Sequence, residues 1–396
     1  MYRFHTLPGA REKAAHYGFK GALYAWESAD TGAETTPERV VVSDGTVVEI
    51  LTGQMEHHIS ADVAYAVWRY WRATGDDDFF LRAGAEILLD TARFWASRAV
   101  ADADGRRHIR HVIGPDEYHE DVDDNAFTNV MARWNIARAL EAIELLRARW
   151  PDQAAALRQK LALGDDELAD WRAAVARIVI GLDSATGLYE QFAGYFALEP
   201  LLVNDIAAPP VAVDLLLGRD RVARSQLIKQ PDVLMLHHLV PDEVEPGSLG
   251  PNLDYYDPRT AHGSSLSPAI TASLLARAGR PDEALEMLRM ALALDLDDLT
   301  GMTGAGLHMA SLGGVWQAVV TGMAGVRVRA GVLTVDPRLP AAWDGLHLRF
   351  RCLGRTVRLD ITHDRTSVWA DAPLMVALPG QTPRKVAGAT SLERAG

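Results

Sequence analysis

The sequence has 396 residues, enough for two or three domains, and its 48% hydrophobic and 23% charged residues are ordinary for a globular protein. A formal net charge of −13 argues against partners such as nucleic acid or an anionic membrane surface. The single cysteine, Cys352, excludes an intrachain disulfide. Because no targeting segment and no apolar run long enough to cross a membrane is present, we expect a cytoplasmic protein.

Helical patterns occupy most of the first 323 residues. Pro268 and Pro281 stand where a first helical turn tolerates proline, and Gly18 follows the end of the first helix. The expected helices span residues 6–17, 56–73, 76–98, 127–149, 165–180, 210–217, 230–236, 268–278, 281–294 and 311–322. Short β-hairpins are expected around Asp44-Gly45 and between residues 102 and 111. Successive helical hairpins of this size can close into an α/α barrel.

The pattern changes after Ala324. Apolar and polar residues alternate in four short runs, at 326–329, 332–335, 346–350 and 356–361. We therefore expect a mainly α protein with a barrel domain at 1–323, a small antiparallel β domain at 324–384, and a disordered tail at 385–396.

The segment from His111 to Asn125 gathers acidic and imidazole side chains around the helix-breaking pair Gly114-Pro115. Partial burial and neighbouring charges can keep one carboxyl group of such a cluster protonated, as a general acid requires. The acid candidates are Asp116, Glu117 and Glu120. The structural alternative is a solvated acidic turn that caps the next helix.

A second segment, Tyr255 to Pro268, places His262, Ser264 and Ser265 just before a helix that we expect Ser267 to cap. Backbone amides, hydroxyl groups, an imidazole and the helix dipole would meet there on an anion such as phosphate. The alternative is a capping turn that uses its serines for its own amides.

Two further segments suit a sugar. Lys229-Gln230 offers a cation and both amide roles to hydroxyl groups, and Trp26-Glu27 sets an aromatic face beside a carboxylate. An exposed helix start is the alternative for Lys229-Gln230. We expect no metal site, because the neighbouring side chains of His57-His58 and of His237-His238 diverge on a helix.

Together these segments resemble glycoside hydrolase family 65, the inverting disaccharide phosphorylases such as maltose, kojibiose or trehalose phosphorylase. The resemblance runs from the first residues to about Asp360. The motifs that carry it are Tyr2-Arg3-Phe4-His5-Thr6-Leu7, Gly18-Phe19-Lys20-Gly21-Ala22, Gly114-Pro115-Asp116-Glu117-Tyr118-His119-Glu120, Lys229-Gln230 and His262-Gly263-Ser264-Ser265-Leu266-Ser267. The resemblance implies an (α/α)6 barrel followed by a small C-terminal β domain.

The resemblance also implies a role for each candidate. Glu117 would be the general acid, and the phosphate ligands would be His262, Ser264 and Ser265. The ligands of the glucosyl unit would be Lys229, Gln230 and Trp26. The products would be β-glucose 1-phosphate and the released sugar, with inorganic phosphate as co-substrate and no cofactor. Because phosphate is already a nucleophile, it needs positioning and charge neutralisation and no catalytic base.

Family members carry a β-sandwich, linker helices and the first barrel helices before the part that this chain resembles. A Phe-Trp-Asp-Thr-Glu segment in that part holds the same glucosyl unit, and the present sequence contains no such segment. We therefore expect a C-terminal portion whose barrel lacks its first helices. Either a separately encoded N-terminal portion completes it, or the chain is a truncated product. The other expected partners are the disaccharide, phosphate and a second copy of the chain in a homodimer.

Two alternative functions stay open at this point. A trehalase-like hydrolase of the same family would need an extra carboxylate base, and the motif His262-Gly263-Ser264-Ser265 argues against it. A truncated, inactive fragment that binds sugars is the non-enzymatic alternative. We expect residues 31–53 and 240–256 to select the acceptor sugar.

Overall fold

The computed structural model describes the whole chain except residues 42–44, 46, 300, 302 and 394–396. Contacts between residues divide it into two compact units. Unit 1 comprises residues 1–200 and 219–228, and unit 2 comprises residues 201–218 and 229–396. This division does not follow the expected boundary at residue 323, because helices of unit 2 pack with one another and with the C-terminal strands.

Unit 1 is helical and carries three short antiparallel hairpins. Its helices are α1 (Tyr2–His5), α2 (Leu7–His16), α3 (Thr52–Met55), α4 (Ile59–Thr74), α5 (Asp77–Phe79), the π-helical turn η1 (Phe80–Gly84), α6 (Ala85–Arg98), α7 (Ala126–Arg149), α8 (Pro151–Lys160), α9 (Asp165–Arg177), the 3₁₀ turn η2 (Tyr195–Ala197) and α11 (Arg219–Val222). Its hairpins are β1 (Arg39–Val41) with β2 (Val47–Glu49), β3 (Val100–Ala101) with β4 (Arg107–His108), and β5 (Leu182–Asp183) with β6 (Leu188–Tyr189).

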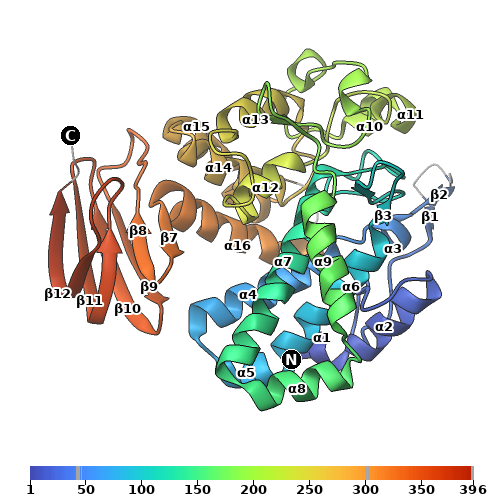
Figure 1. The fold of residues 1–396 in the computed structure, drawn as a ribbon. Helices are drawn as coiled ribbons and strands as arrows, with labels where there is room; N and C mark the ends of the chain where they lie inside the picture. Colours follow the sequence, from blue (N-terminus) through green and yellow to red (C-terminus); the bar gives the residue numbers. More distant parts are fainter. Residues whose placement is uncertain (42–44, 46, 300, 302, 394–396) are drawn as a thin grey trace. The chain divides into compact units, whose positions relative to one another are not determined.

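The core of unit 1 lies where α6 and α7 pack together, with α4 and α9 against them (Figure 1). Trp95 and Trp171 are fully buried there, and Phe80 stacks on Trp71 with their ring centroids 4.0 Å apart. Local signals set the helix ends. Asn125 caps α7 because its Oδ1 accepts a hydrogen bond from the amide of Thr128 at 2.8 Å. The long helices of this unit thus follow the expected pattern.

Unit 2 begins with short helices and ends in a β-sheet. Its helices are η3 (Val203–Asp205), α10 (Val213–Leu217), α12 (Val233–Leu239), α13 (Leu249–Tyr256), η4 (Asp257–Arg259), α14 (Ser267–Arg277), α15 (Pro281–Leu296), η5 (Thr303–Ala305), α16 (Met309–Gln317) and the π-helical turn η6 (Ala318–Met323). Its strands are β7 (Val326–Arg329), β8 (Val332–Val335), β9 (Leu346–Cys352), β10 (Arg355–Ile361), β11 (Arg365–Ala377) and β12 (Arg384–Glu393).

The sheet has the order β7-β8-β11-β10-β9, and β12 also pairs with β11 (Figure 1). The expected antiparallel sheet is mixed, because β11 runs parallel to β8 with Met375 opposite Val332. The expectation of a disordered tail at 385–396 was wrong for residues 385–393, which form most of β12 and hydrogen-bond along β11. The apolar face of the sheet includes Val357, Leu359 and Val368, all buried.

Several expected element bounds shift for identifiable reasons. The helix expected at 210–217 begins at Val213, since the amide of Val211 bonds to the carbonyl of Ala261 at 3.0 Å. The helix expected at 230–236 begins at Val233, because Pro231 disfavours helical geometry in the residue before it. The hairpin expected at Asp44-Gly45 is present as β1 and β2, although Asp44 lies outside the described residues.

Candidate active site

The segment that contains Glu117 is a closed loop between β4 and α7. The backbones of Val112 and Val122 exchange two hydrogen bonds, at 3.0 and 2.9 Å, and so tie the two ends of the loop together. Asn125 then starts α7 directly behind it. The loop is therefore held by its own backbone and by a helix cap, and it is more than a solvated acidic turn.

Inside this loop Asp116 and His119 form a buried ion pair, with Asp116 Oδ2 2.6 Å from His119 Nδ1. The same Asp116 oxygen accepts a hydrogen bond from Gln191 Nε2 at 2.9 Å. The other imidazole nitrogen of His119 faces the carbonyl of Ser225 at 2.9 Å. Asp116 was one of the three acid candidates, and in the structure it anchors the loop together with His119.

Glu117 itself is half-buried and interacts electrostatically with two other carboxylates, Glu56 and Glu120. Burial raises the pKa of Glu56 to about 7, against the lowering effect of His58, and the charge of Glu117 adds to the rise. Burial also raises the pKa of Glu120, while Arg219, whose Nη2 lies 3.5 Å from Glu120 Oε1, opposes that rise. Glu117 thus lies in an acidic environment in which a neighbouring carboxyl group, that of Glu56, can hold a proton near neutral pH.

His58 connects this acidic cluster to Trp26. Its Nδ1 lies 2.6 Å from Asp62 Oδ2, and its Nε2 lies 3.3 Å from Glu56 Oε1. Burial lowers the pKa of His58, but these two carboxylates outweigh burial and raise it to about 10. The imidazole packs edge-on against Trp26, with the two centroids 5.3 Å apart. A continuous set of contacts therefore runs from Trp26 through His58 and Glu56 towards Glu117.

Trp26 owes its position to the glycine-containing segment before it. Gly21 has φ +76°, and a Cβ there would overlap the carbonyl oxygen of Asp90 in α6. Beyond it, the amide of Ala22 bonds to the Asp90 carbonyl at 3.0 Å, and the amide of Tyr24 bonds to Ser60 Oγ at 3.0 Å. Only glycine permits so close an approach, so this segment lies fixed between α6 and α4.

In unit 2 the Lys229 segment and the His262 segment lie side by side. The amide of Gly263 donates a hydrogen bond to the carbonyl of Lys229 at 3.1 Å. Lys229 and Gln230 are both half-buried, and so are Ser264 and Ser265. The residues expected to hold the sugar and those expected to hold the anion are therefore adjacent in space although more than thirty positions separate them in the sequence.

His262 is buried and has a left-handed backbone with φ 51°. Its Nδ1 lies 2.7 Å from Ser267 Oγ. Burial lowers the pKa of His262 to about 4, so the imidazole is neutral at pH 7. If Ser267 donates to Nδ1, the Nε2 hydrogen is left to bind an anion.

The expectation that Ser267 caps α14 was wrong. The helix begins at Ser267 itself, Leu266 is the N-cap, and the Ser267 hydroxyl contacts His262. Ser264 makes the turn instead: its carbonyl accepts from the amide of Ser267 at 3.2 Å, and its Oγ accepts from that of Leu266 at 3.3 Å. The hydroxyl hydrogen of Ser264 stays available to an anion.

The structure divides the seven predicted site residues between the two units. Unit 1 holds Glu117 and Trp26, and unit 2 holds Lys229, Gln230, His262, Ser264 and Ser265. Three residues of the acidic cluster were not predicted from the sequence, namely Glu56, His58 and Asp62. The sequence feature that could have indicated this cluster is the run Glu56-His57-His58 directly before an apolar helix. All three of these ionisable side chains are buried there.

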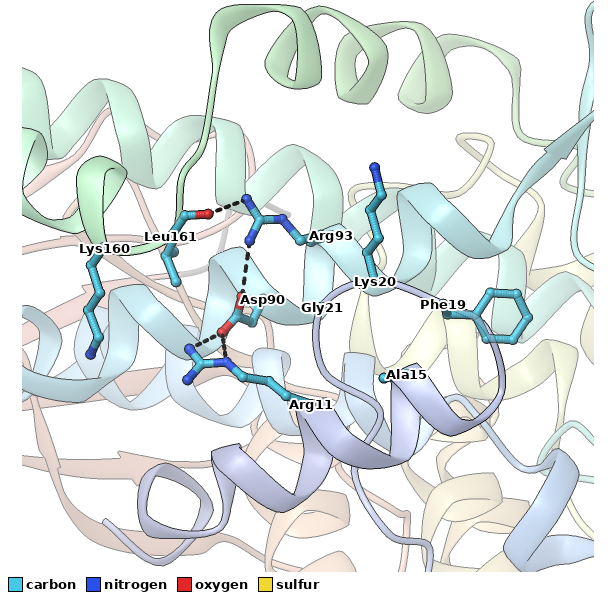
Figure 2. Close-up of a pocket in the computed structure, with 9 residues that line it drawn as sticks. All are labelled: Arg11, Ala15, Phe19, Lys20, Gly21, Asp90, Arg93, Lys160 and Leu161. Atoms are coloured by element: carbon cyan, nitrogen blue, oxygen red, sulfur yellow. Dashed lines mark hydrogen bonds and ion pairs between the residues drawn. The ribbon is translucent and has the colours of Figure 1, made fainter.

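A separate pocket of about 420 Å³ in unit 1 is lined by charged residues (Figure 2). Arg11 and Arg93 converge there on Asp90, at 2.8 Å for Arg11 Nε and 3.8 Å for Arg93 Nη1. Lys160 pairs with Glu86 at 2.7 Å. Arg11, Arg93 and Lys160 are thus each paired with a carboxylate, and these pairs join α2, α6 and α8.

No group of three or more His, Cys, Asp or Glu side chains in the described part of the chain is arranged to hold a metal ion. No helix that the structure describes is long and apolar enough to cross a membrane.

Comparison with known proteins connects these segments to one family. The sequence model of the Glycosyl hydrolase family 65 central catalytic domain matches residues 1–317, and that of the Glycosyl hydrolase family 65, C-terminal domain matches residues 326–383. A solved structure titled "Putative kojibiose phosphorylase from human microbiome" covers 100% of this chain and 56% of its own, with a TM-score of 0.88 and 25% identity. The predicted fold class, a mainly α protein with an (α/α)6 barrel and a small β domain, is confirmed.

Several curated relatives are phosphorylases. Kojibiose phosphorylase of Halothermothrix orenii is 41% identical over 93% of this chain and 47% of its own length. The 1,2-alpha-glucosylglycerol phosphorylase of Bacillus selenitireducens is 37% identical over 93% and 49%. The alpha,alpha-trehalose phosphorylase of Thermoanaerobacter brockii is 36% identical over 92% and 46%. The chain thus spans about half the length of the curated relatives it matches.

Proposed function

The chain belongs to glycosyl hydrolase family 65, and on that premise we propose that it catalyses inverting phosphorolysis of an α-glucosidic disaccharide. The products are β-glucose 1-phosphate and the released sugar. The relatives named above act on different α-glucosides, so the proposal concerns the glucosyl unit and leaves the acceptor open.

One observation carries the proposal most directly: the hydrogen bond at 3.1 Å between the Gly263 amide and the Lys229 carbonyl. It supports a site in which the residues for a glucosyl unit adjoin those for phosphate. An inverting phosphorylase needs this arrangement, because the phosphate oxygen must reach C1 of the bound glucosyl unit. The neutral His262, the Ser264 hydroxyl and the start of α14 all offer hydrogen-bond donors to such an anion.

In the proposed reaction Glu117 donates its proton to the glycosidic oxygen as the bond from that oxygen to C1 breaks. A phosphate oxygen attacks C1 from the opposite face, which inverts the configuration. The acceptor sugar leaves with the transferred proton on its hydroxyl group. Positioning and charge neutralisation of phosphate replace the catalytic base of a hydrolase. Lys229, Gln230 and Trp26 bind the glucosyl unit in this scheme.

The test is an assay of the 396-residue chain with kojibiose, trehalose, maltose and nigerose, each with and without inorganic phosphate. We expect release of β-glucose 1-phosphate from at least one disaccharide only when phosphate is present. A trehalase-like hydrolase would release free glucose without phosphate. No phosphate-dependent product in either the forward or the synthetic direction would overturn the proposal.

Two substitutions test whether Glu117 is the general acid. Glu117→Gln keeps the size of the side chain but cannot donate the proton, so activity should fall by at least about a hundredfold. Glu12→Gln removes an exposed carboxylate of α2 and serves as the matched control with unchanged activity. Full activity of Glu117→Gln would exclude Glu117 as the general acid.

Three further points belong to the same proposal. The reaction uses inorganic phosphate and no cofactor. The protein acts in the cytoplasm, where a single cysteine stays reduced. It assembles as a homodimer. Size-exclusion chromatography with light scattering tests the dimer on the purified chain.

A further inference from the structure

A pocket of about 540 Å³ within unit 2 lies where α14 and η6 meet the strands β7 and β8. Its charged lining consists of Arg277, Arg327, Arg329, Arg338 and Asp336. Four guanidinium groups and one carboxylate in one pocket are unusual in a chain whose formal net charge is −13. None of these residues belongs to the candidate active site.

Two carboxylates near the pocket form ion pairs with its outer arginines. Arg329 forms an ion pair with Asp242, and both side chains are exposed. Arg338 Nη2 lies 3.4 Å from Asp336 Oδ2, and these two side chains are about half exposed. The acidic groups therefore sit at the mouth of the pocket.

Arg277, at the end of α14, is in a different situation. It is half-buried, its Nη1 donates to the carbonyl of His237 at 2.5 Å, and it has no carboxylate ion pair in the described part of the chain. Burial lowers the pKa of Arg277 to about 9, and the charges of Arg327 and Arg329 contribute to that fall, whereas the charge of Asp242 opposes it. The pocket thus contains one guanidinium group, that of Arg277, with no carboxylate paired to it among the described residues.

His238, a neighbouring histidine, is affected by the charges of Arg277 and Arg327. Burial lowers the pKa of His238 to about 4, and the charges of Arg277 and Arg327 lower it further, although Gln317, 2.8 Å from His238 Nε2, acts in the opposite direction. The charges of Arg277 and Arg327 therefore also act on His238.

We propose that this pocket binds a small molecule that carries one or more phosphate groups. Guanidinium groups bind phosphate oxygens in pairs through their planar fork of N–H donors, which suits several arginines around one anion. The volume is within the range of small-molecule sites and exceeds what a single inorganic phosphate needs. Such a ligand would neutralise Arg277 and connect the helices of unit 2 to its sheet.

The proposal does not depend on the proposed function, and the experiment distinguishes anion binding in this pocket from anion binding in the candidate active site. All variants carry His262→Ala, which removes one candidate phosphate ligand of the active site and so weakens anion binding there. The probe is tripolyphosphate, titrated into the 396-residue chain by isothermal calorimetry at low and at high salt. We expect binding in this background and weaker binding at high salt, because screening reduces charge–charge attraction.

Arg277→Met and Arg327→Gln should each weaken tripolyphosphate binding by about tenfold or more. Arg349→Gln removes an exposed arginine on β9 outside the pocket and should leave it unchanged. Circular dichroism shows whether each variant is folded. If Arg277→Met does not fold, the affinity of Arg327→Gln, at a half-buried position of β7, tests the proposal instead. Absence of binding in the His262→Ala background, or equal binding by the pocket variants and Arg349→Gln, would overturn the proposal.

Discussion

The carboxylate of Asp116 lies 2.6 Å from Nδ1 of His119, and the side chains of both are almost inaccessible to solvent, 0% and 3% exposed. Because Nε2 of His119 also faces an acceptor, the Ser225 carbonyl, both ring nitrogens donate when Asp116 is ionised. Removing one partner would leave the other charge buried and uncompensated. Asp116→Ala should therefore lower the free energy of unfolding by about 3–5 kcal/mol, measured by urea denaturation.

An exposed pair of the same chemistry is the control for this prediction. His111 Nδ1 lies 2.7 Å from Asp121 Oδ1, and these side chains are 71% and 53% exposed. Asp121→Ala should change the free energy of unfolding by less than about 1 kcal/mol. Equal effects of the two substitutions would show that Asp116 does not anchor the loop electrostatically.

The buried carboxyl group of Glu56 predicts a pH dependence of stability. Its pKa is raised from 4.5 to about 7, so the folded protein holds the proton more tightly than the unfolded chain. The contribution is complete below pH 4.5 and is lost as the pH rises through 7. Between these values the free energy of unfolding should fall by about 1–3 kcal/mol more in the wild type than in Glu56→Gln. Denaturation at several pH values measures this difference. The same pH dependence of the free energy of unfolding in the wild type and in Glu56→Gln would contradict the prediction.

His262 predicts a specific effect on phosphate. His262→Ala removes a hydrogen-bond donor from the proposed anion ligands, so the KM for phosphate should rise by about 10- to 100-fold. The value of kcat should change less, because the lost contact exists before the reaction as well as during it. His347→Ala, at a side chain that is 78% exposed, should leave both constants unchanged. An unchanged KM for phosphate in His262→Ala would remove His262 from the proposed phosphate site.

Gly21 predicts a backbone effect. In Gly21→Ala the new Cβ would overlap the Asp90 carbonyl oxygen, in addition to the cost of a left-handed alanine. Gly75 is also left-handed, at φ +70°, but a Cβ there would meet no atom within 4 Å. Gly75→Ala therefore measures the cost of a left-handed alanine without a steric overlap. Gly75→Ala should cost about 1–2 kcal/mol, and Gly21→Ala at least about 2 kcal/mol more. Thermal unfolding compares them, and equal losses would refute the close approach.

Much of the helical part could be predicted because its signals are local. The spacing of apolar residues, Asn125 at the start of α7 and Pro281 at the start of α15 all act over one or two turns. The strands β11 and β12 were missed because their alternation is broken. Pro373 and a register shift between Ala370 and Leu374 interrupt β11, and Gly388 interrupts β12.

The candidate site could be predicted only in part. The residues of the acidic loop and of the His262 turn are contiguous in the sequence, so their chemistry could be recognised there. The cluster of Trp26, His58 and Glu56 depends on packing between segments about thirty residues apart, which no local pattern reveals. The contact of Ser267 with His262 was missed for the opposite reason, because a serine before a proline has a strong local interpretation as a helix cap.

The parallel pairing of β11 with β8 has a consequence for the order in which unit 2 can form. β11 hydrogen-bonds with β8, β10 and β12, so these three strands are not joined into one sheet until residues 365–377 have been synthesised. During synthesis the hairpin of β7 and β8 forms before its partner strand exists, since Val332 pairs with Met375, about forty residues later. Closing that long loop costs entropy before the pairing contributes stability. Ribosome-bound chains that stop before Arg365 should therefore keep the edge of β8 open and be more readily cleaved by proteases than chains that include β11.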